Sequence, residues 1–134
     1  MKPNLVRVRD VMRTDFETID GMATIEDAVR RMKAIDSRCL MVNKRDEDDE
    51  HGILLLASIA RRVVAHNLSP ARVNVYEIMA KPLISVRPEM RIHHCAQLFA
   101  RLNLSRTPVI DQDQQVVGIV SYANLVLNAM LPDG

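Results

Sequence analysis

Ser121 and Asn124 are the side chains whose types and spacing point most directly to binding chemistry. They lie three positions apart where an apolar run ends and a helical pattern begins, so both face the same way at a helix N-terminus. That end of a helix offers free backbone N–H groups and a partial positive charge, which suit a phosphate group. The same pair also fits a helix cap, with Ser121 as the N-cap residue. Taken as residues alone, the two interpretations are equal alternatives.

Other polar residues give weaker signals. Arg106 and Lys81 carry charge that could hold a phosphate, or are solvated surface charges, and for Lys81 the solvated role is preferred. His93 and His94 are adjacent, so they do not face one metal ion. The acidic run 46–50 lacks the alternating spacing and turning glycine of a calcium loop, which favours a solvated hairpin. We predict no metal site and, without a nucleophile–base pair or a phosphate-binding glycine loop, no enzymatic activity.

Composition excludes several classes of protein. The chain has 134 residues, of which 48% are hydrophobic, so a substantial core is expected and global disorder is not. A net charge of +1 and 3% aromatic residues argue against a nucleic-acid-binding protein. No apolar run is long enough for a membrane helix, and the charged N-terminal segment does not resemble a signal peptide. Cys39 and Cys95 have neither metal-ligand nor disulfide-framework spacing, which fits reduced thiols in the cytoplasm.

The most informative feature is an internal duplication. Val11-Met12 aligns with Ile78-Met79 at an offset of 67 residues, and the same offset aligns apolar positions as far as Val42 and Val109. Beyond an acidic loop the offset becomes 66, which aligns Gly52-Ile53-Leu54 with Gly118-Ile119-Val120. A loop tolerates such a one-residue difference at low cost. The order of apolar and polar positions therefore predicts two copies of one fold.

Each copy has the pattern β-α-β-β-α. In the first copy we predict an extended piece at 17–19, a helix at 24–35, a strand at 39–42 and a closing helix at 57–66. In the second copy we predict the equivalent elements at 84–86, 91–102, 107–110 and 123–130. We predict repeat 1, with an N-terminal helical segment, at 1–68, and a linker with repeat 2 at 69–134. The fold class is α/β (α+β). One copy is too small to cover its sheet, so the two repeats are expected to pack sheet to sheet.

The chain resembles a tandem pair of CBS domains, also called a Bateman module. The likeness rests on Asp10-Val11-Met12 and Glu77-Ile78-Met79, on the run Ser105 to Asp111, and on the closing segment Gly118 to Leu125. The family closes its repeat with Gly-apolar-apolar-Ser/Thr-x-x-Asp. This chain departs only at the last position, where it has Asn124, and an amide forms weaker hydrogen bonds to ribose hydroxyls than a carboxylate.

The resemblance implies two pseudo-symmetric sites for adenosine-bearing ligands in a cleft between the repeats. Site one is preferred, and it would comprise Phe16, Glu17, Thr18, Arg38, Cys39, Leu40, Ile119, Ser121 and Asn124. Site two would comprise Ile53, Leu55, Ser58, Lys81, Leu83, Ile84, Ser105, Arg106 and Thr107. Site two is degenerate because Leu55 and Ser58 replace the polar pair of the closing motif.

The expected function is that of a regulatory sensor. AMP, ADP, ATP or S-adenosylmethionine would bind in the cleft as a regulatory ligand and change the orientation of the repeats, which a partner protein on another polypeptide would detect. No cofactor is required. The resemblance also implies a homodimer of four CBS repeats, joined head to head or head to tail through the closing helices. The alternative is a constitutive dimeric scaffold for protein interactions whose ligand sites have degenerated.

Overall fold

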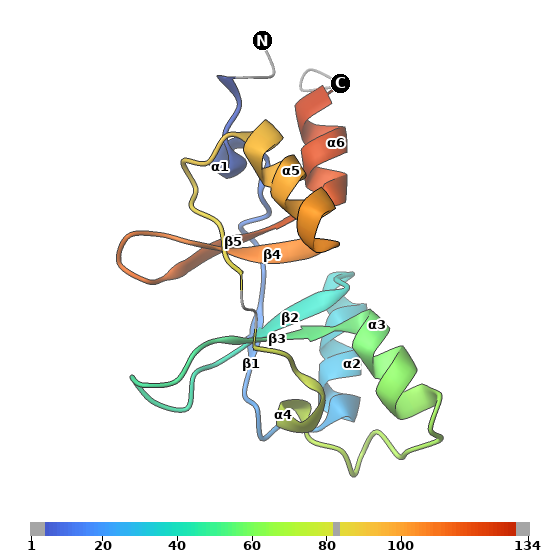
Figure 1. The fold of residues 1–134 in the computed structure, drawn as a ribbon. Coiled ribbons are helices and arrows are strands. Elements are labelled where there is room, and N and C mark those ends of the chain that lie inside the picture. The colour runs from blue at the N-terminus through green and yellow to red at the C-terminus, as the bar shows by residue number, and fades with distance from the viewer. Residues whose placement is uncertain (1–4, 82–83, 131–134) are drawn as a thin grey trace. The chain divides into compact units, whose positions relative to one another are not determined.

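In the computed structural model, which describes residues 5–81 and 84–130, both halves of the chain contain the same order of elements (Figure 1). The first half contains α1 (Val8–Val11), β1 (Thr18–Ile19), α2 (Ile25–Ile35), β2 (Cys39–Val42), β3 (Gly52–Leu55) and α3 (Leu56–Ile59), which continues as a π-helical segment, Ala60–Val64. The second half contains α4 (Val75–Ile78), α5 (Ile92–Leu102), β4 (Arg106–Ile110), β5 (Val116–Ser121) and α6 (Tyr122–Met130). The predicted α+β class and the duplication are confirmed.

The long helices α2 and α5 end in the same way in both halves. Helix α2 begins with a capping box, in which Thr24 Oγ1 accepts from the N–H of Asp27 at 3.1 Å and Asp27 accepts from the N–H of Thr24 at 3.3 Å. The C-cap residues that follow α2 and α5 are Asp36 and Asn103, with left-handed φ angles of 51° and 54°. Asp and Asn tolerate this conformation better than most residues, so the halves stop their helices at equivalent positions.

The strand pairs also share one register. Strands β2 and β3 are antiparallel, with Val42 opposite Gly52, and β4 and β5 are antiparallel, with Val109 opposite Gly118. Strand β1 joins β2 in parallel to complete a three-stranded sheet. In the second half Val86 takes the place of β1, because its N–H donates to Pro108 and its carbonyl accepts from Ile110. The predicted extended piece at 84–86 thus contributes a single bridge rather than a strand.

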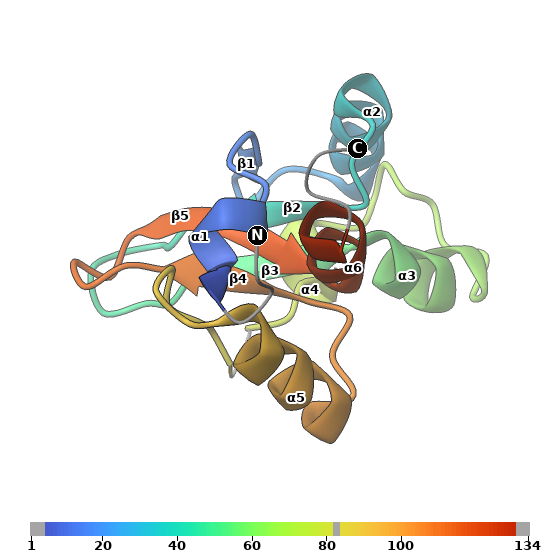
Figure 2. The same ribbon diagram turned by 90° about the horizontal axis from the view of Figure 1, so that it is seen from above.

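The compact units are not the two halves of the sequence. Residues 17–81 form one unit, and residues 5–16 with 84–130 form the other. Helix α1 therefore packs against α6 and β5, while α4 belongs to the unit of β1–β3 (Figure 2). Backbone hydrogen bonds fix this exchange, since Arg13 pairs with Ile119 in one unit and Ala80 with Ile53 in the other. The short helix at the start of each half completes the fold of the other half.

Each unit has its own aliphatic core. In the 17–81 unit the core includes Leu40 and Leu54, both fully buried, and Val75 of α4. In the other unit it includes Val8 of α1, Phe99 of α5 and Val120 of β5. The helical spacing of the apolar side chains in α2 and α5 directs them into these cores, as the sequence pattern predicts.

Candidate functional site

The Ser121–Asn124 pair forms a reciprocal cap at the junction of β5 and α6. The Ser121 N–H donates to Asn124 Oδ1 at 3.0 Å, and the Asn124 N–H donates to Ser121 Oγ at 3.3 Å. The capping interpretation therefore describes the observed geometry. In this cap both side chains act only as hydrogen-bond acceptors. The Ser121 hydroxyl hydrogen and the Asn124 NH2 group can therefore still donate to another group. Capping and ligand contact are compatible, and contact with a ligand stays a prediction.

Phe16 and Ile119 lie in the same unit as this cap. Ile119 is 5% exposed, and its N–H and carbonyl are both bonded to Arg13, at 3.0 and 2.9 Å. Its backbone is therefore occupied, and it offers a ligand only the small exposed part of its side chain. Phe16 is half-buried at the end of the leading segment.

The other predicted residues of site one lie in the 17–81 unit. Leu40 is fully buried and belongs to its core, and Cys39 is 5% exposed. Arg38 is exposed, but its carbonyl accepts from the Leu56 N–H at 2.9 Å. The Glu17 carbonyl likewise accepts from the Met41 N–H. The side chains that remain accessible in this set are those of Glu17, Thr18 and Arg38.

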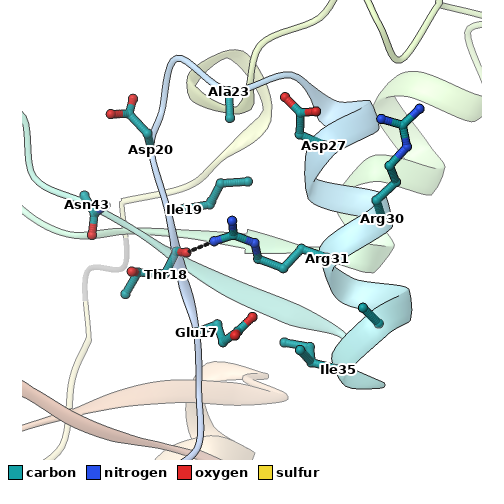
Figure 3. Close-up of a pocket in the computed structure, with 11 residues that line it drawn as sticks. Glu17, Thr18, Ile19, Asp20, Ala23, Asp27, Arg30, Arg31, Ile35 and Asn43 are labelled. Atoms are coloured by element: carbon teal, nitrogen blue, oxygen red, sulfur yellow. Dashed lines mark hydrogen bonds between the residues drawn. The ribbon is translucent and has the colours of Figure 1, made fainter.

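Glu17 and Thr18 line a hollow of about 750 Å³ between β1 and α2 (Figure 3). The Arg31 guanidinium reaches across it and donates to the Thr18 carbonyl at 2.7 Å. The other lining residues are not among the predicted site residues; they are Ile19, Asp20, Ala23, Asp27, Arg30, Arg31, Ala34, Ile35 and Asn43. A signal was present for part of this set, because positions 27, 30, 31 and 34 follow helical spacing and share one face of α2.

The starts of α3 and α6 differ in their capping. Leu55 stands at the N-cap of α3 and makes no side-chain cap hydrogen bond, in contrast to Ser121 before α6. Ile53 is 5% exposed, and Ser58 is half-buried. Leu83 lies outside the described residues. The start of α3 therefore lacks the polar pair that the start of α6 has.

Of the remaining residues of site two, Ile84, Ser105, Arg106 and Thr107 lie in the unit that contains β4, and Lys81 lies in the 17–81 unit. Ser105 is exposed and Arg106 half-buried, and the Ser105 carbonyl accepts from the Tyr122 N–H at 3.2 Å. Thr107 is only 2% exposed, and its hydroxyl donates to the Ile84 carbonyl at 2.6 Å. This bond ties the segment before α5 to β4. The Thr107 hydroxyl therefore already has a structural role.

Thr107→Val should lower the free energy of unfolding by about 1 kcal/mol, because it removes the donor to the Ile84 carbonyl while nearly preserving shape. The shift of the urea midpoint measures this loss. Thr14→Val, at an exposed position, is the control and should leave the midpoint unchanged. Equal midpoints for Thr107→Val and wild type would show that the bond contributes nothing to stability.

Lys81 is held by the acidic hairpin rather than solvated. Its ammonium group lies 3.1 Å from Asp49 Oδ1 and also donates to the Glu50 carbonyl. The Arg45 N–H donates to Asp49 Oδ2 at 2.9 Å. Both groups stabilise the carboxylate, so hydrogen bonds from the Arg45 backbone and the Lys81 side chain hold the pKa of Asp49 well below its usual range. The Lys81 charge is thus paired with the hairpin at the surface, and its contact with a ligand stays a prediction.

The low pKa of Asp49 predicts a pH dependence of stability. Since the folded-state pKa lies below the unfolded value, the stabilisation is present above about pH 4 and is lost as the pH falls through the folded-state value. Thermal melts of wild type should therefore lose stability below pH 4 more steeply than those of Asp49→Asn. Asp48→Asn, on the same hairpin, is the control and should follow wild type. Parallel curves for wild type and Asp49→Asn would contradict the assignment.

Together, these observations define an α+β module of two repeats that exchange their leading helices and carry a capped helix junction able to donate to a ligand. The family model for the CBS domain matches the chain twice, at residues 8–65 and 75–129. The chain therefore belongs to the CBS domain family, as a tandem pair. No helix among the described residues has the length and apolar character needed to cross a membrane.

Three similar proteins illustrate the relationship. The CBS domain-containing protein YhcV of Bacillus subtilis is 31% identical over 92% of this chain and 85% of its own. A hexameric CBS-CP12 protein from bloom-forming cyanobacteria superposes with a TM-score of 0.89 at 36% identity, over 96% of this chain and 70% of its own. The CBS domain pair of protein MJ0100, solved with 5′-methylthioadenosine and S-adenosyl-L-methionine, gives a TM-score of 0.75 at 25% identity, over 90% of this chain and 96% of its own.

Some curated relatives carry the names of enzymes. This chain spans only 23% of the length of the homoserine O-acetyltransferases and sulfurtransferases that it matches. Such a match therefore reports a shared CBS pair and assigns no activity to it.

Proposed function

We propose that this chain is a non-catalytic, cytoplasmic regulatory module that binds an adenosine-containing ligand and transmits its binding to a partner protein. The observation that carries the proposal is the cap at β5–α6, where the Ser121 hydroxyl hydrogen and the Asn124 NH2 group take no part in the mutual hydrogen bonds. A phosphate or carboxylate would accept from the Ser121 hydroxyl, at a helix start whose partial positive charge favours an anion. The adenosine ligands of MJ0100 support this class of ligand.

The residues predicted for site one are divided between the units. Ser121, Asn124 and Phe16 belong to one unit, and Glu17, Thr18 and Arg38 to the other. Because each unit has its own core, a ligand can shift the conformational equilibrium of the chain without unfolding either unit. Such a change is the signal that we propose a partner protein detects.

Calorimetric titration with AMP, ATP and S-adenosylmethionine tests the proposal. We expect one ligand to bind near one equivalent per chain, and Asn124→Ala to weaken it by about fivefold, the loss of one hydrogen bond at the ligand. Glu77→Ala is the matched control, because it breaks the corresponding cap at α4, where Glu77 accepts from the Asn74 N–H at 2.7 Å. Binding that is insensitive to Asn124→Ala would move the ligand away from the β5–α6 junction.

A constitutive dimeric scaffold is the second candidate, and the exposed apolar face of α6 favours it. Val126, Leu127 and Met130 are 50%, 63% and 71% exposed, and such a patch on a helix is typical of a protein interface. The hexameric assembly of the CBS-CP12 protein is consistent with association of such modules. Absence of heat with every ligand, from a folded protein that light scattering shows to be a dimer, would favour the scaffold over the sensor.

A further inference from the structure

The 17–81 unit contains a second hollow, which shares only Lys81 with the predicted ligand residues. Its volume is about 590 Å³, within the range of about 300–1,000 Å³ usual for small-molecule sites. Four short segments line it. They are Asp20–Met22 after β1, residues 42–45 at the end of β2, Tyr76 of α4 with Met79 directly after that helix, and Lys81. Its residues come from one unit, so its shape does not depend on the placement of the other.

The base of this hollow is apolar and its side is aromatic. Val42 is fully buried beneath it, and Met79 packs against the core of the unit. Tyr76 is 50% exposed and Met22 70% exposed, so both present large apolar surfaces that the unit itself does not cover. A flat apolar group placed here would be in contact with an aromatic ring and two thioethers, which are favourable neighbours for aromatic ligands.

The rim is positively charged. Lys44, Arg45 and Lys81 line it, and Asp20 is the negatively charged residue among the lining side chains. The Asp20 carboxylate accepts from the Met22 N–H at 2.7 Å, and Asp49 lies between Arg45 and Lys81. Within the described residues Lys44 forms no ion pair, so its ammonium group is the cation best able to meet an anionic ligand.

Burial and local charge at His51 show that these cations converge. Burial lowers the pKa of His51, and the positive charges of Lys44 and Lys81 lower it further, while a hydrogen bond with the Val42 backbone and the charge of Asp49 act in the opposite direction. His51 Nδ1 is buried and has no hydrogen-bond partner among the described residues. This corner of the unit therefore brings Lys44 and Lys81 together, with Asp49 also close by. Lys44, which forms no ion pair among the described residues, supplies local positive charge of the kind that attracts anions.

Backbone hydrogen bonds hold the walls of the hollow in place. The Tyr76 N–H donates to the Gly21 carbonyl at 2.9 Å, which fixes α4 against the loop after β1. The Asn43 N–H donates to Ile19 at 3.0 Å, and the Asn74 side chain donates to the Met22 carbonyl at 2.9 Å. A ligand would meet a largely formed site and would not need to order these segments, which lowers the entropic cost of binding.

The duplication supplies an internal comparison. At the offset of 67 residues, Lys44 and Arg45 correspond to Asp111 and Gln112, and Tyr76 corresponds to Arg9. The second copy of the fold thus has neither the basic pair nor the aromatic side chain at these positions. The combination of aromatic wall and basic rim is specific to the 17–81 unit and is not required by the fold.

We infer that this hollow binds a small aromatic anion, with a flat apolar body against Tyr76 and Met79 and a phosphate, sulfonate or carboxylate at Lys44 and Arg45. The site is independent of the proposed adenosine site, since it uses neither Ser121 nor Asn124. A second small molecule could therefore bind to the same chain. The chemistry of the rim selects for negative charge, and the apolar base selects against simple inorganic phosphate.

Titration with 1-naphthyl phosphate, followed by calorimetry and amide NMR, tests the inference. Because the probe carries no adenosine, its binding and that of adenine nucleotides can fail separately. We expect binding near one equivalent per chain, with shifts at Gly21, Asn43 and Tyr76. Lys44→Gln with Arg45→Gln should weaken binding at least tenfold, because it removes the charge-assisted hydrogen bonds to the anion. Tyr76→Leu should weaken binding about threefold, because aromatic stacking adds only a modest free energy to that of the buried apolar area.

Lys33→Gln with Arg101→Gln is the matched control, because it removes the same charge from exposed positions outside this hollow. It should leave affinity within twofold of wild type. Thermal melts establish whether each variant is folded. If the Lys44–Arg45 variant is not folded, Tyr76→Leu still tests whether the probe binds in this hollow. Equal weakening by both charge variants, unchanged binding in the Lys44–Arg45 variant, or absence of binding at millimolar probe would each overturn the inference.

Discussion

Gly118→Ala is expected to lower the free energy of unfolding by about 3 kcal/mol, at the upper end of the range for overpacked cores. A Cβ atom at Gly118 would lie 2.6 Å from Met12 Sδ and 3.0 Å from the carbonyl oxygen of Arg13. The methionine can move, but the Arg13 carbonyl cannot easily do so, because it accepts from the Ile119 N–H. The substitution therefore forces apart β5 and the segment directly after α1, which the hydrogen bonds between Arg13 and Ile119 hold together.

Gly52→Ala is the matched comparison in the other unit. There the new Cβ would meet Met79 Sδ at 2.7 Å and Val42 Cβ at 3.2 Å, with no backbone atom among its three nearest contacts. A flexible side chain can rotate away, so we expect a smaller loss of about 1 kcal/mol. Urea unfolding followed by circular dichroism measures both. Equal losses, or a larger loss for Gly52→Ala, would show that contact with the Arg13 backbone is not the decisive constraint.

Asn124→Asp is expected to strengthen binding of the adenosine ligand about tenfold, because the carboxylate would accept from the ribose hydroxyls, and hydrogen bonds to a charged acceptor are about twice as strong as neutral ones. The carboxylate would still accept from the Ser121 N–H, as the amide does at 3.0 Å. A negative charge in the first turn of α6 also interacts favourably with the helix dipole, so the fold should be retained. The substitution restores the acidic residue with which this family closes its repeat.

Calorimetry on wild type and Asn124→Asp gives the ratio of affinities directly. Asn67→Asp introduces the same charge change on an exposed position of the other unit and should leave the affinity unchanged. Loss of binding in Asn124→Asp would indicate that repulsion from a ligand phosphate dominates at this position. An unchanged affinity would place position 124 outside the ligand contacts.

Local patterns in the sequence determined the elements. Apolar side chains at helical spacing predicted α2 and α5 to within one residue, because burial of that face stabilises each helix. The shared glycines Gly52 and Gly118 predicted the duplicated register, which places each glycine opposite a valine. The Asp111–Gln115 hairpin forms without glycine, because Gln114 adopts a left-handed φ of 63°. Polar spacing at Ser121 and Asn124 predicted the cap, since a capping box depends on residues three apart.

Contacts between distant residues were decided only by the tertiary structure. The exchange of α1 and α4 between the halves depends on bonds such as Arg13 to Ile119, across more than a hundred residues, and no local pattern specifies them. The pairing of Lys81 with the Asp49 carboxylate, and the hydrogen bond from Arg31 to the Thr18 carbonyl, depend on groups that only folding brings near these long side chains. Short-range periodicity therefore determined which elements form. Packing of the two cores decided which polar groups are accessible and which are already bonded.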